Sequence, residues 1–138
     1  MRGRRDVYVY LCLQSNDTIN SDEIMSIVKN PPSNIEIKGD YVSILNHKVK
    51  LKWNRVKYCL PVTHGFRLDR VFKKLIRLVN NPKQLGEYCI EHNIGVFLYI
   101  VIEGFNRKTP FPYTVFNDDF ITFIRETGAE VDFDVYVY

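Results

Sequence analysis

Cysteine and histidine, the residue types that most often supply a nucleophile and its base, each occur three times in this sequence. A thiol and an imidazole could form a catalytic pair in the fold, because such partners need not be close in sequence. However, His47 falls in an expected turn, His92 at an expected helix end, and Cys89 on the apolar side of that helix. These positions are typical of structural residues. We therefore predict no catalytic pair from this group, which also includes His64 and Cys59.

Asp132 and Asp134 form a second candidate, since alternation along a strand would place both carboxylates on one face. Two such carboxylates could act as general acid and base or bind a cation. On a solvated strand face they more commonly serve solubility. The sequence has no CxxC or HxxxH metal spacing and no glycine-rich phosphate loop. We predict a protein that is not an enzyme and holds no cofactor or metal; an enzyme built on Asp132, Asp134 and a histidine ranks third among the alternatives.

Basic residues are concentrated in the middle of the chain. Residues 38–77 hold eleven Lys and Arg against two Asp, a net charge of +9, whereas residues 78–138 carry −5. A helix-spaced stripe and a strand row could track a phosphate backbone, and tyrosines on an open sheet face could stack bases. Asp132 and Asp134 would lie on the same face as Tyr136, which argues against that use. The stripe is Arg67, Arg70, Lys74 and Arg77, the row is Lys48, Lys50 and Lys52, and the other tyrosines are Tyr8, Tyr10 and Tyr99.

Protein contact is the third kind of chemistry that these residues support. Trp53, the single tryptophan, stands beside Arg55, and both residue types are enriched at binding hot spots. Trp53 could equally cover the core. The loop of residues 104–113 is stiffened by prolines, so its aromatic side chains would lose little entropy on binding, unless they are tucked beneath it. The predicted partner-binding residues are Trp53, Arg55, Arg67, Arg70, Lys74, Arg77, Phe105, Phe111 and Tyr113.

The elements that position these residues follow from hydrophobic periodicity. The run 94–102 is apolar and β-branched, and it predicts a central strand covered on both faces. Asn20 and Asn117 are expected helix caps, and Gly128 an expected left-handed helix end. Gly86 weakens the prediction of a helix after Pro82. Other strands are expected at 7–13, 41–45, 49–53, 56–60 and 129–138, with a hairpin turn at 46–47, and the clearest helix spans 67–80.

This order of elements predicts an α+β fold with a mainly antiparallel sheet and helices packed on one face. A ferredoxin-like split βαβ variant with an inserted hairpin is the expected topology. The whole chain, 1–138, is expected to form one domain, with residues 1–5 a basic N-terminal segment. The pentapeptide Asp-Val-Tyr-Val-Tyr occurs at 6–10 and again at 134–138, so we expect the first and last strands to be neighbours in the sheet.

The cysteines and the N-terminal residues predict the cellular compartment of the protein. Three cysteines without CxxC pairs fit a reduced, cytoplasmic protein. The first residues are basic but lack the apolar stretch of a secretory signal, and the longest apolar run is too short to span a membrane.

The closing stretch of the chain, residues 123–136, combines an apolar helix end, a glycine turn and then Asp-Phe-Asp-Val-Tyr. It is preceded by the strand 7–13, the segment 21–24, Pro31-Pro32, Lys38-Gly39, Trp53, the helix 68–79 and the strand 96–102. This succession resembles a family of small bacterial proteins, the domain of unknown function 4279 family, and the closing stretch is the most specific part of the match. The resemblance implies an α+β domain with no assigned activity and no catalytic residues. Some family members look like immunity proteins in toxin gene neighbourhoods.

The sequence and the resemblance together predict a protein-binding domain, in its concrete form an immunity protein that neutralises a cognate bacterial toxin by direct binding. The basic segment would suit an acidic patch on the toxin and speed association. The protein is expected to be a monomer or a homodimer. A nucleic-acid-binding module using the basic face of residues 48–77 ranks second.

Overall fold

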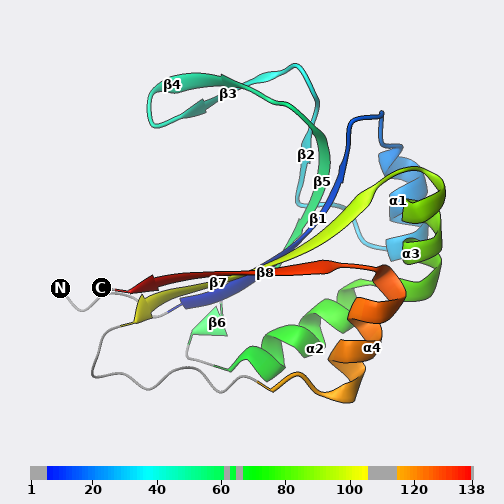
Figure 1. Cartoon of the computed structure of the whole chain (residues 1–138), viewed down its shortest axis with the longest axis vertical. Coiled ribbons are helices and arrows are strands. Elements are labelled where there is room, and N and C mark those ends of the chain that lie inside the picture. The colour runs from blue at the N-terminus through cyan, green and yellow to red at the C-terminus, as the bar shows by residue number, and fades with distance from the viewer. Residues whose placement is uncertain (1–5, 61–62, 65–66, 106–114, 138) are drawn as a thin grey trace.

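The computed structural model describes residues 6–60, 63–64, 67–105 and 115–137 (Figure 1). These residues form an α+β fold with a mixed, mostly antiparallel sheet whose main order is β2-β5-β1-β7-β8. The strands are β1 (Asp6–Ser15), β2 (Asn34–Glu36), β5 (Asn54–Cys59), β7 (Gly95–Phe105) and β8 (Glu130–Val137), with β6 (Thr63–His64) paired to the start of β1.

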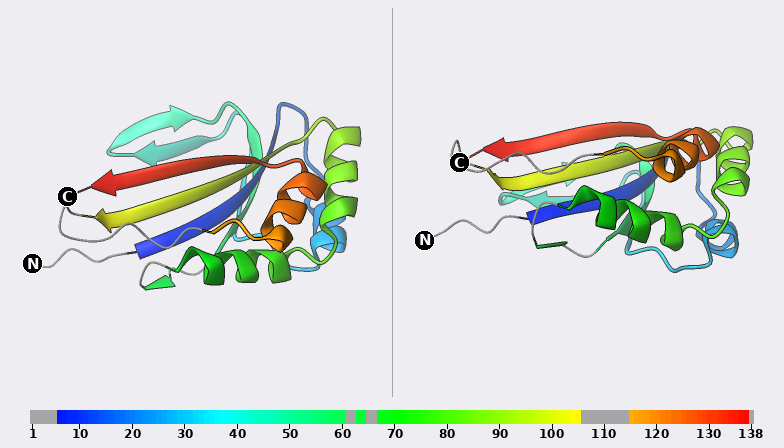
Figure 2. Two further views of the ribbon diagram at one scale, coloured as in Figure 1. Left: turned by 60° about the horizontal axis from the view of Figure 1, so that its bottom comes forward. Right: turned by 90° about the horizontal axis from the view of Figure 1, so that it is seen from below.

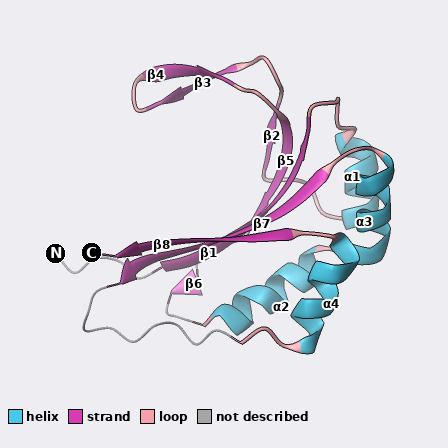
Figure 3. Cartoon of the chain, in the orientation of Figure 1, coloured by secondary structure: helices cyan, strands magenta, loops and turns pink. Residues whose placement is uncertain are grey.

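The described helices cover one face and one end of this sheet (Figure 3). They are α1 (Ser21–Val28), α2 (Leu68–Leu78), α3 (Pro82–Glu91) and α4 (Asp118–Thr127). The predicted caps are confirmed: the Asn20 side chain accepts from two N–H groups of α1, Asn117 accepts from Phe120, and Gly128 ends α4 with a φ of 68°. The helix-facing side of β1 is fully buried and forms the centre of the core with α2; its residues are Val7, Val9, Leu11 and Leu13.

A two-stranded hairpin stands apart from the main sheet (Figure 2). It consists of β3 (Tyr41–Ile44) and β4 (His47–Lys50), and its turn residues Leu45 and Asn46 have φ angles of 49° and 64°. Two successive positive φ angles are the signature of the tight type I′ hairpin turn. The hairpin was expected, but its turn lies one residue earlier than predicted. The sequence did not indicate this position, since leucine disfavours the positive φ that Leu45 adopts.

β7 lies inside the sheet, between β1 and β8, as predicted. The burial of its two faces differs from the expectation. Leu98 and Ile100 are fully buried beneath the helices, whereas Phe97 and Tyr99, on the other face, are only half-buried. The prediction that this strand is covered on both faces is confirmed only in part: Val101 on the second face is buried, but no described helix packs on that face (Figure 3).

The first and last strands are not neighbours, which corrects the expectation from the repeated pentapeptide. β1 and β8 lie on opposite sides of β7, and Val7 and Val135 both stand opposite Ile102. The repeat therefore marks two strands with a shared neighbour. The ferredoxin-like arrangement is not confirmed: β7 and β8 are parallel and adjacent, whereas a split βαβ unit has a strand between its parallel pair.

Some local features departed from the sequence patterns. The short strands β2 and β6 were not expected, and the apolar helix residues Ile90 and Ile121 are 83% and 50% exposed. Gly86, expected to weaken α3, is buried where α3 meets α4. A Cβ at this position would lie 2.0 Å from the carbonyl oxygen of Glu126. The close approach of the two helices therefore requires glycine. None of the described helices combines the length and apolarity needed to cross a membrane.

Candidate functional site

The face of the sheet opposite the helices carries aromatic and polar side chains that are only partly buried. Strand alternation points Tyr8 and Tyr10 of β1 and Tyr99 of β7 to this helix-free face. The rings of Tyr10 and Tyr99 stack with centroids 4.7 Å apart. Partial burial, followed by the neighbouring Tyr99, raises the pKa of Tyr10 to about 12. The face thus presents a rigid aromatic surface with hydroxyl groups at its rim.

One border of this surface is basic. Arg55 and Lys57 extend from β5 onto the helix-free face, in register with Gln14 and Cys12 of β1. The Arg55 Nε donates to the Gln14 Oε1 at 2.7 Å. Lys57 forms an ion pair with Glu36 of β2, and its Nζ lies 6.0 Å from the centroid of the Tyr10 ring. These contacts hold the cations at fixed positions beside the aromatic stack.

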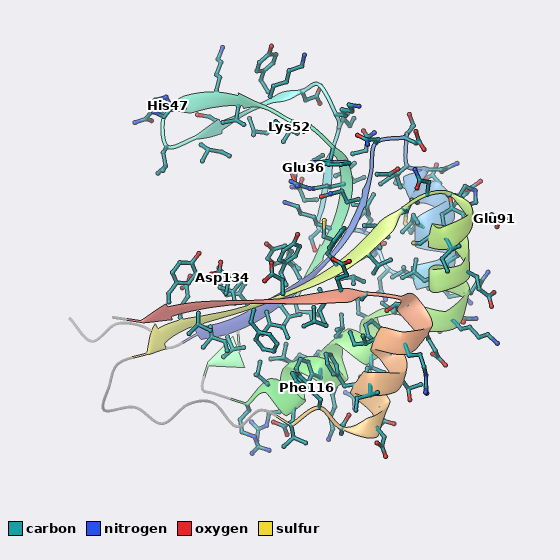
Figure 4. All side chains as sticks on the ribbon, in the orientation of Figure 1. Glu36, His47, Lys52, Glu91, Phe116 and Asp134 are labelled. Atoms are coloured by element: carbon teal, nitrogen blue, oxygen red, sulfur yellow. The ribbon has the colours of Figure 1, made fainter. Side chains whose placement is uncertain are left out.

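The β3–β4 hairpin adds a cleft to the same border. The cleft has a volume of about 340 Å³ and lies between the hairpin and strands β2 and β5, which contribute Glu36, Arg55 and Lys57. Glu36 and Lys52, which both line the cleft, are labelled in Figure 4. Its aliphatic wall comes from the hairpin and from the segment that follows it. The lining residues are Val42, Ile44, Val49, Lys50, Leu51, Lys52 and Trp53, with Glu36, Arg55 and Lys57.

The opposite border of the face is acidic. Asp132 and Asp134 of β8 are exposed there, and Glu103 lies nearby on β7. The Tyr136 hydroxyl donates to the Asp134 Oδ2 at 2.9 Å, and the Tyr8 hydroxyl donates to the Glu103 Oε1 at 3.3 Å. Cations and carboxylates therefore flank the tyrosines on opposite sides, which gives the face a direction for an oriented partner.

The structure divides the predicted site residues between two surfaces. Trp53 and Arg55 line the hairpin cleft. The basic stripe lies on α2, on the helix side of the sheet (Figure 1), where Arg67 pairs with Asp69 at 2.9 Å. Exposed members of that stripe are Arg70, Lys74 and Arg77. Phe105 belongs to β7 and not to the expected loop, whereas Phe111 and Tyr113 lie outside the described residues.

Sequence reasoning did not place Tyr10, Tyr99 and Lys57 in the partner-binding set. The signal was present in part, because alternation already put the tyrosines on one face. What the sequence lacks is the strand order. Only the pairing of β5 with β1 brings Lys57 to the aromatic stack, and only the curled hairpin brings aliphatic side chains toward β5 (Figure 1).

Two of the three cysteines lie in settings that disfavour a nucleophile, whereas Cys59, one of the two candidate nucleophiles, is exposed. Cys12 and Cys89 are buried, and burial raises the pKa of both thiols, that of Cys89 to about 12. A thiol with a raised pKa is a poor nucleophile. The His92 ring stacks on Tyr88 at the end of α3. Across the described ranges, no three His, Cys, Asp or Glu side chains are grouped so that they could hold a metal ion.

Together, the fold and the helix-free face define a small α+β domain with a surface suited to binding. Residues 5–138 match the family described as Domain of unknown function (DUF4279). The chain belongs to this family. Comparison with curated proteins and with solved structures finds no match.

Proposed function

We propose that this chain is a non-enzymatic protein-binding domain that holds its partner on the helix-free face of the sheet and in the hairpin cleft. The observation that carries this proposal is the partly exposed Tyr10–Tyr99 stack, with Arg55 and Trp53 on its basic side. Tyrosine, tryptophan and arginine are the residues that dominate protein–protein binding energy. Their fixed positions reduce the entropy lost on binding.

The partner's surface is complementary to this face. Arg55 and the exposed lysines of the hairpin would meet acidic side chains, and the aliphatic wall of the cleft would take an apolar one. The ion pair between Lys57 and Glu36 leaves Lys57 partly neutralised, so Arg55 is the cation best placed for a new charged contact. Complementary charge would speed association and orient the partner.

The concrete form of the proposal is an immunity protein that neutralises a cognate bacterial toxin by direct binding. The support is the resemblance of some family members to immunity proteins and the net charge of +9 over residues 38–77. It implies a bacterial protein that acts in the cytoplasm, where its three cysteines, all free, would stay reduced.

A nucleic-acid-binding module that uses the basic face of residues 48–77 is the second candidate. Besides the exposed lysines of the hairpin, it is favoured by the exposed stripe of Arg70, Lys74 and Arg77 on α2. This stripe and the tyrosines lie on opposite sides of the sheet, so phosphate contacts on α2 could not accompany base stacking on Tyr10 and Tyr99. These two rings also stack on each other, which leaves less ring surface for bases. Both features favour a protein partner.

The first experiment is capture of partners by the tagged chain from its native cells, with and without nuclease. The proposal predicts one discrete protein that survives nuclease and that slows growth when it is expressed without the chain. Co-expression of the chain should restore growth. Retention that disappears with nuclease and weakens steeply with salt would support the nucleic-acid candidate instead.

A further inference from the structure

The outer edges of β2 and β8 in the main sheet, and of β3 and β4 in the hairpin, have no strand partner among the described residues. Of these strands, β8 and β4 carry complementary patterns of charged and apolar side chains. Unpaired edges expose N–H and C=O groups that readily pair with another strand. A two-stranded hairpin is also only marginally stable alone in water. The edges of β8 and β4 are therefore candidates for pairing between molecules.

The edge strand β8 has one acidic side and one apolar side. Asp132 and Asp134 are exposed on the helix-free side. Phe133 and Val135 point to the helix side, where they remain 42% and 39% exposed. Figure 4 shows Asp134 on the helix-free side of β8 and Phe116 on the opposite side. A strand added at this edge would need basic residues alternating with apolar ones.

β4 and the residues that follow it have this alternation. Lys48 and Lys50 point to one side of the hairpin and are exposed, and none of the ion pairs formed by described residues involves them. Strand alternation points Val49 and Leu51 to the other side, and both line the hairpin cleft of their own molecule. Lys52 continues the basic row.

We propose that β4 of a second copy of this chain pairs antiparallel with the outer edge of β8. With Val49 opposite Phe133, the basic side of one strand faces the acidic side of the other along the whole contact. Opposite charges and apolar pairs at facing positions stabilise strand pairing. The facing pairs are Lys48 with Asp134, Lys50 with Asp132, Lys52 with Glu130, and Leu51 with Val131. Reciprocal exchange of the two hairpins closes a two-fold dimer.

An apolar cavity next to β8 suits the other side of the incoming hairpin. It has a volume of about 400 Å³ and opens between β8 and α4, lined by Phe116, Ile121, Phe133 and neighbouring residues. Side chains that alternate with the lysines, such as Val49, would extend toward it. Pairing of β8 with a second β8 fits less well, because centring it on Phe133 would set Asp132 opposite Asp134 of the other copy.

The hairpin tip gives a further indication that this element is covered. Leu45 is 89% exposed and has a φ of 49°, a conformation in which asparagine or glycine is favoured. Strain of this kind often persists where a residue has a function in binding. Contact with a second copy would place this exposed apolar side chain in an interface.

A charge exchange tests the pairing. The hairpin variant, Lys48→Glu with Lys50→Glu, reverses the charge of β4. The edge variant, Asp132→Lys with Asp134→Lys, reverses the charge of β8. Sedimentation of the parent from about 10 µM to about 1 mM should show a dimer. Each variant alone should dissociate at least about tenfold more readily, because both contacts in its dimer join like charges. An equal mixture of the two variants should recover the parent's affinity, because both contacts in a mixed dimer join opposite charges.

Circular dichroism of each variant first establishes that it is folded, and recovery in the mixture provides an independent check. A parent that stays monomeric throughout this range would overturn the proposal. So would a mixture that remains as weak as its components. If the hairpin variant alone associates as tightly as the parent, pairing of β8 with β8 is the better account, because that pairing contains no hairpin residue. None of these measurements uses the protein partner, so they do not depend on the proposed function. Because Val49 and the hairpin lysines would take part in both contacts, the dimer and the partner complex exclude each other.

Discussion

At the residue scale, Gly86 illustrates how a single position can be decided by a neighbour far along the chain. Its missing side chain leaves room for the carbonyl oxygen of Glu126, 2.0 Å from where a Cβ would stand. Gly86→Ala should lower the free energy of unfolding by at least about 3 kcal/mol, because helices α3 and α4 would have to separate. Urea denaturation measures this loss. The matched control is Glu87→Ala, an exposed position on the same helix, which should change stability by less than about 0.5 kcal/mol. Equal stability of the two variants would show that the helices are not in this close contact.

Residue patterns predicted the caps well and the close contacts poorly. Asn20, Asn117 and Gly128 act within a few residues of their own position, so local sequence was sufficient to identify them. The role of Gly86 depends on a helix 40 residues away, and no local pattern contains that information. In the candidate site, Trp53 and Arg55 were predicted by type alone, whereas Lys57 became a site residue only through strand pairing.

At the scale of elements, the β3–β4 hairpin combines a strained turn with an exposed aliphatic side. Leu45→Asn should relieve the positive-φ strain and slow amide hydrogen exchange in β3 and β4, by up to about fivefold for a gain near 1 kcal/mol. Nuclear magnetic resonance can follow these amides individually. Exchange in the hairpin that is unchanged or faster would contradict the view that the Leu45 side chain is kept at the cost of local stability.

Element boundaries followed from the sequence wherever one face of the element is buried. The alternation of β1 and the apolar stripe of α2 predicted both elements, because burial on one side creates the periodicity. We predicted the hairpin turn at Asn46-His47 because that pair is the more polar one. In the structure the turn residues are Leu45 and Asn46. β2 and β6 are three and two residues long, too short to show any period.

At the scale of the whole molecule, the tyrosines make stability depend on alkaline pH. Burial raises the pKa of Tyr10, Tyr58 and Tyr88 to about 12, against 10.0 for an unperturbed tyrosine. The folded state therefore holds these protons more tightly than the unfolded state does. Their contribution to stability is complete below pH 10 and is lost as the pH rises from about 10 to about 12.

Unfolding in urea at a series of pH values should show this decline, and Tyr58→Phe should make it shallower. The variant should also lose about 1 kcal/mol at neutral pH, because the Tyr58 hydroxyl donates to the carbonyl oxygen of Asn30 at 3.0 Å. A stability that stays constant from pH 9 to 12 would mean that these hydroxyls ionise freely in the folded protein.

The strand order of the molecule, β2-β5-β1-β7-β8, is the feature that the sequence could least reveal. The α+β class followed from the element pattern, but the repeated pentapeptide suggested an incorrect neighbour for β8. The two copies of the pentapeptide belong to two strands that both pair with β7, β1 antiparallel and β8 parallel. Because the helix-free face is assembled from β5, β1, β7 and β8, its composition could not be predicted without that order.

The central claim is that a protein partner binds the helix-free face and not the stripe on α2. The most direct measurement is the dissociation constant of the purified partner for the parent, for Arg55→Ala and for Arg70→Ala. Each variant removes one arginine, from β5 and from α2 respectively, so net charge changes equally. The account predicts a dissociation constant raised at least about tenfold by Arg55→Ala and nearly unchanged by Arg70→Ala. The reverse order would place the binding surface on the helices and contradict the account.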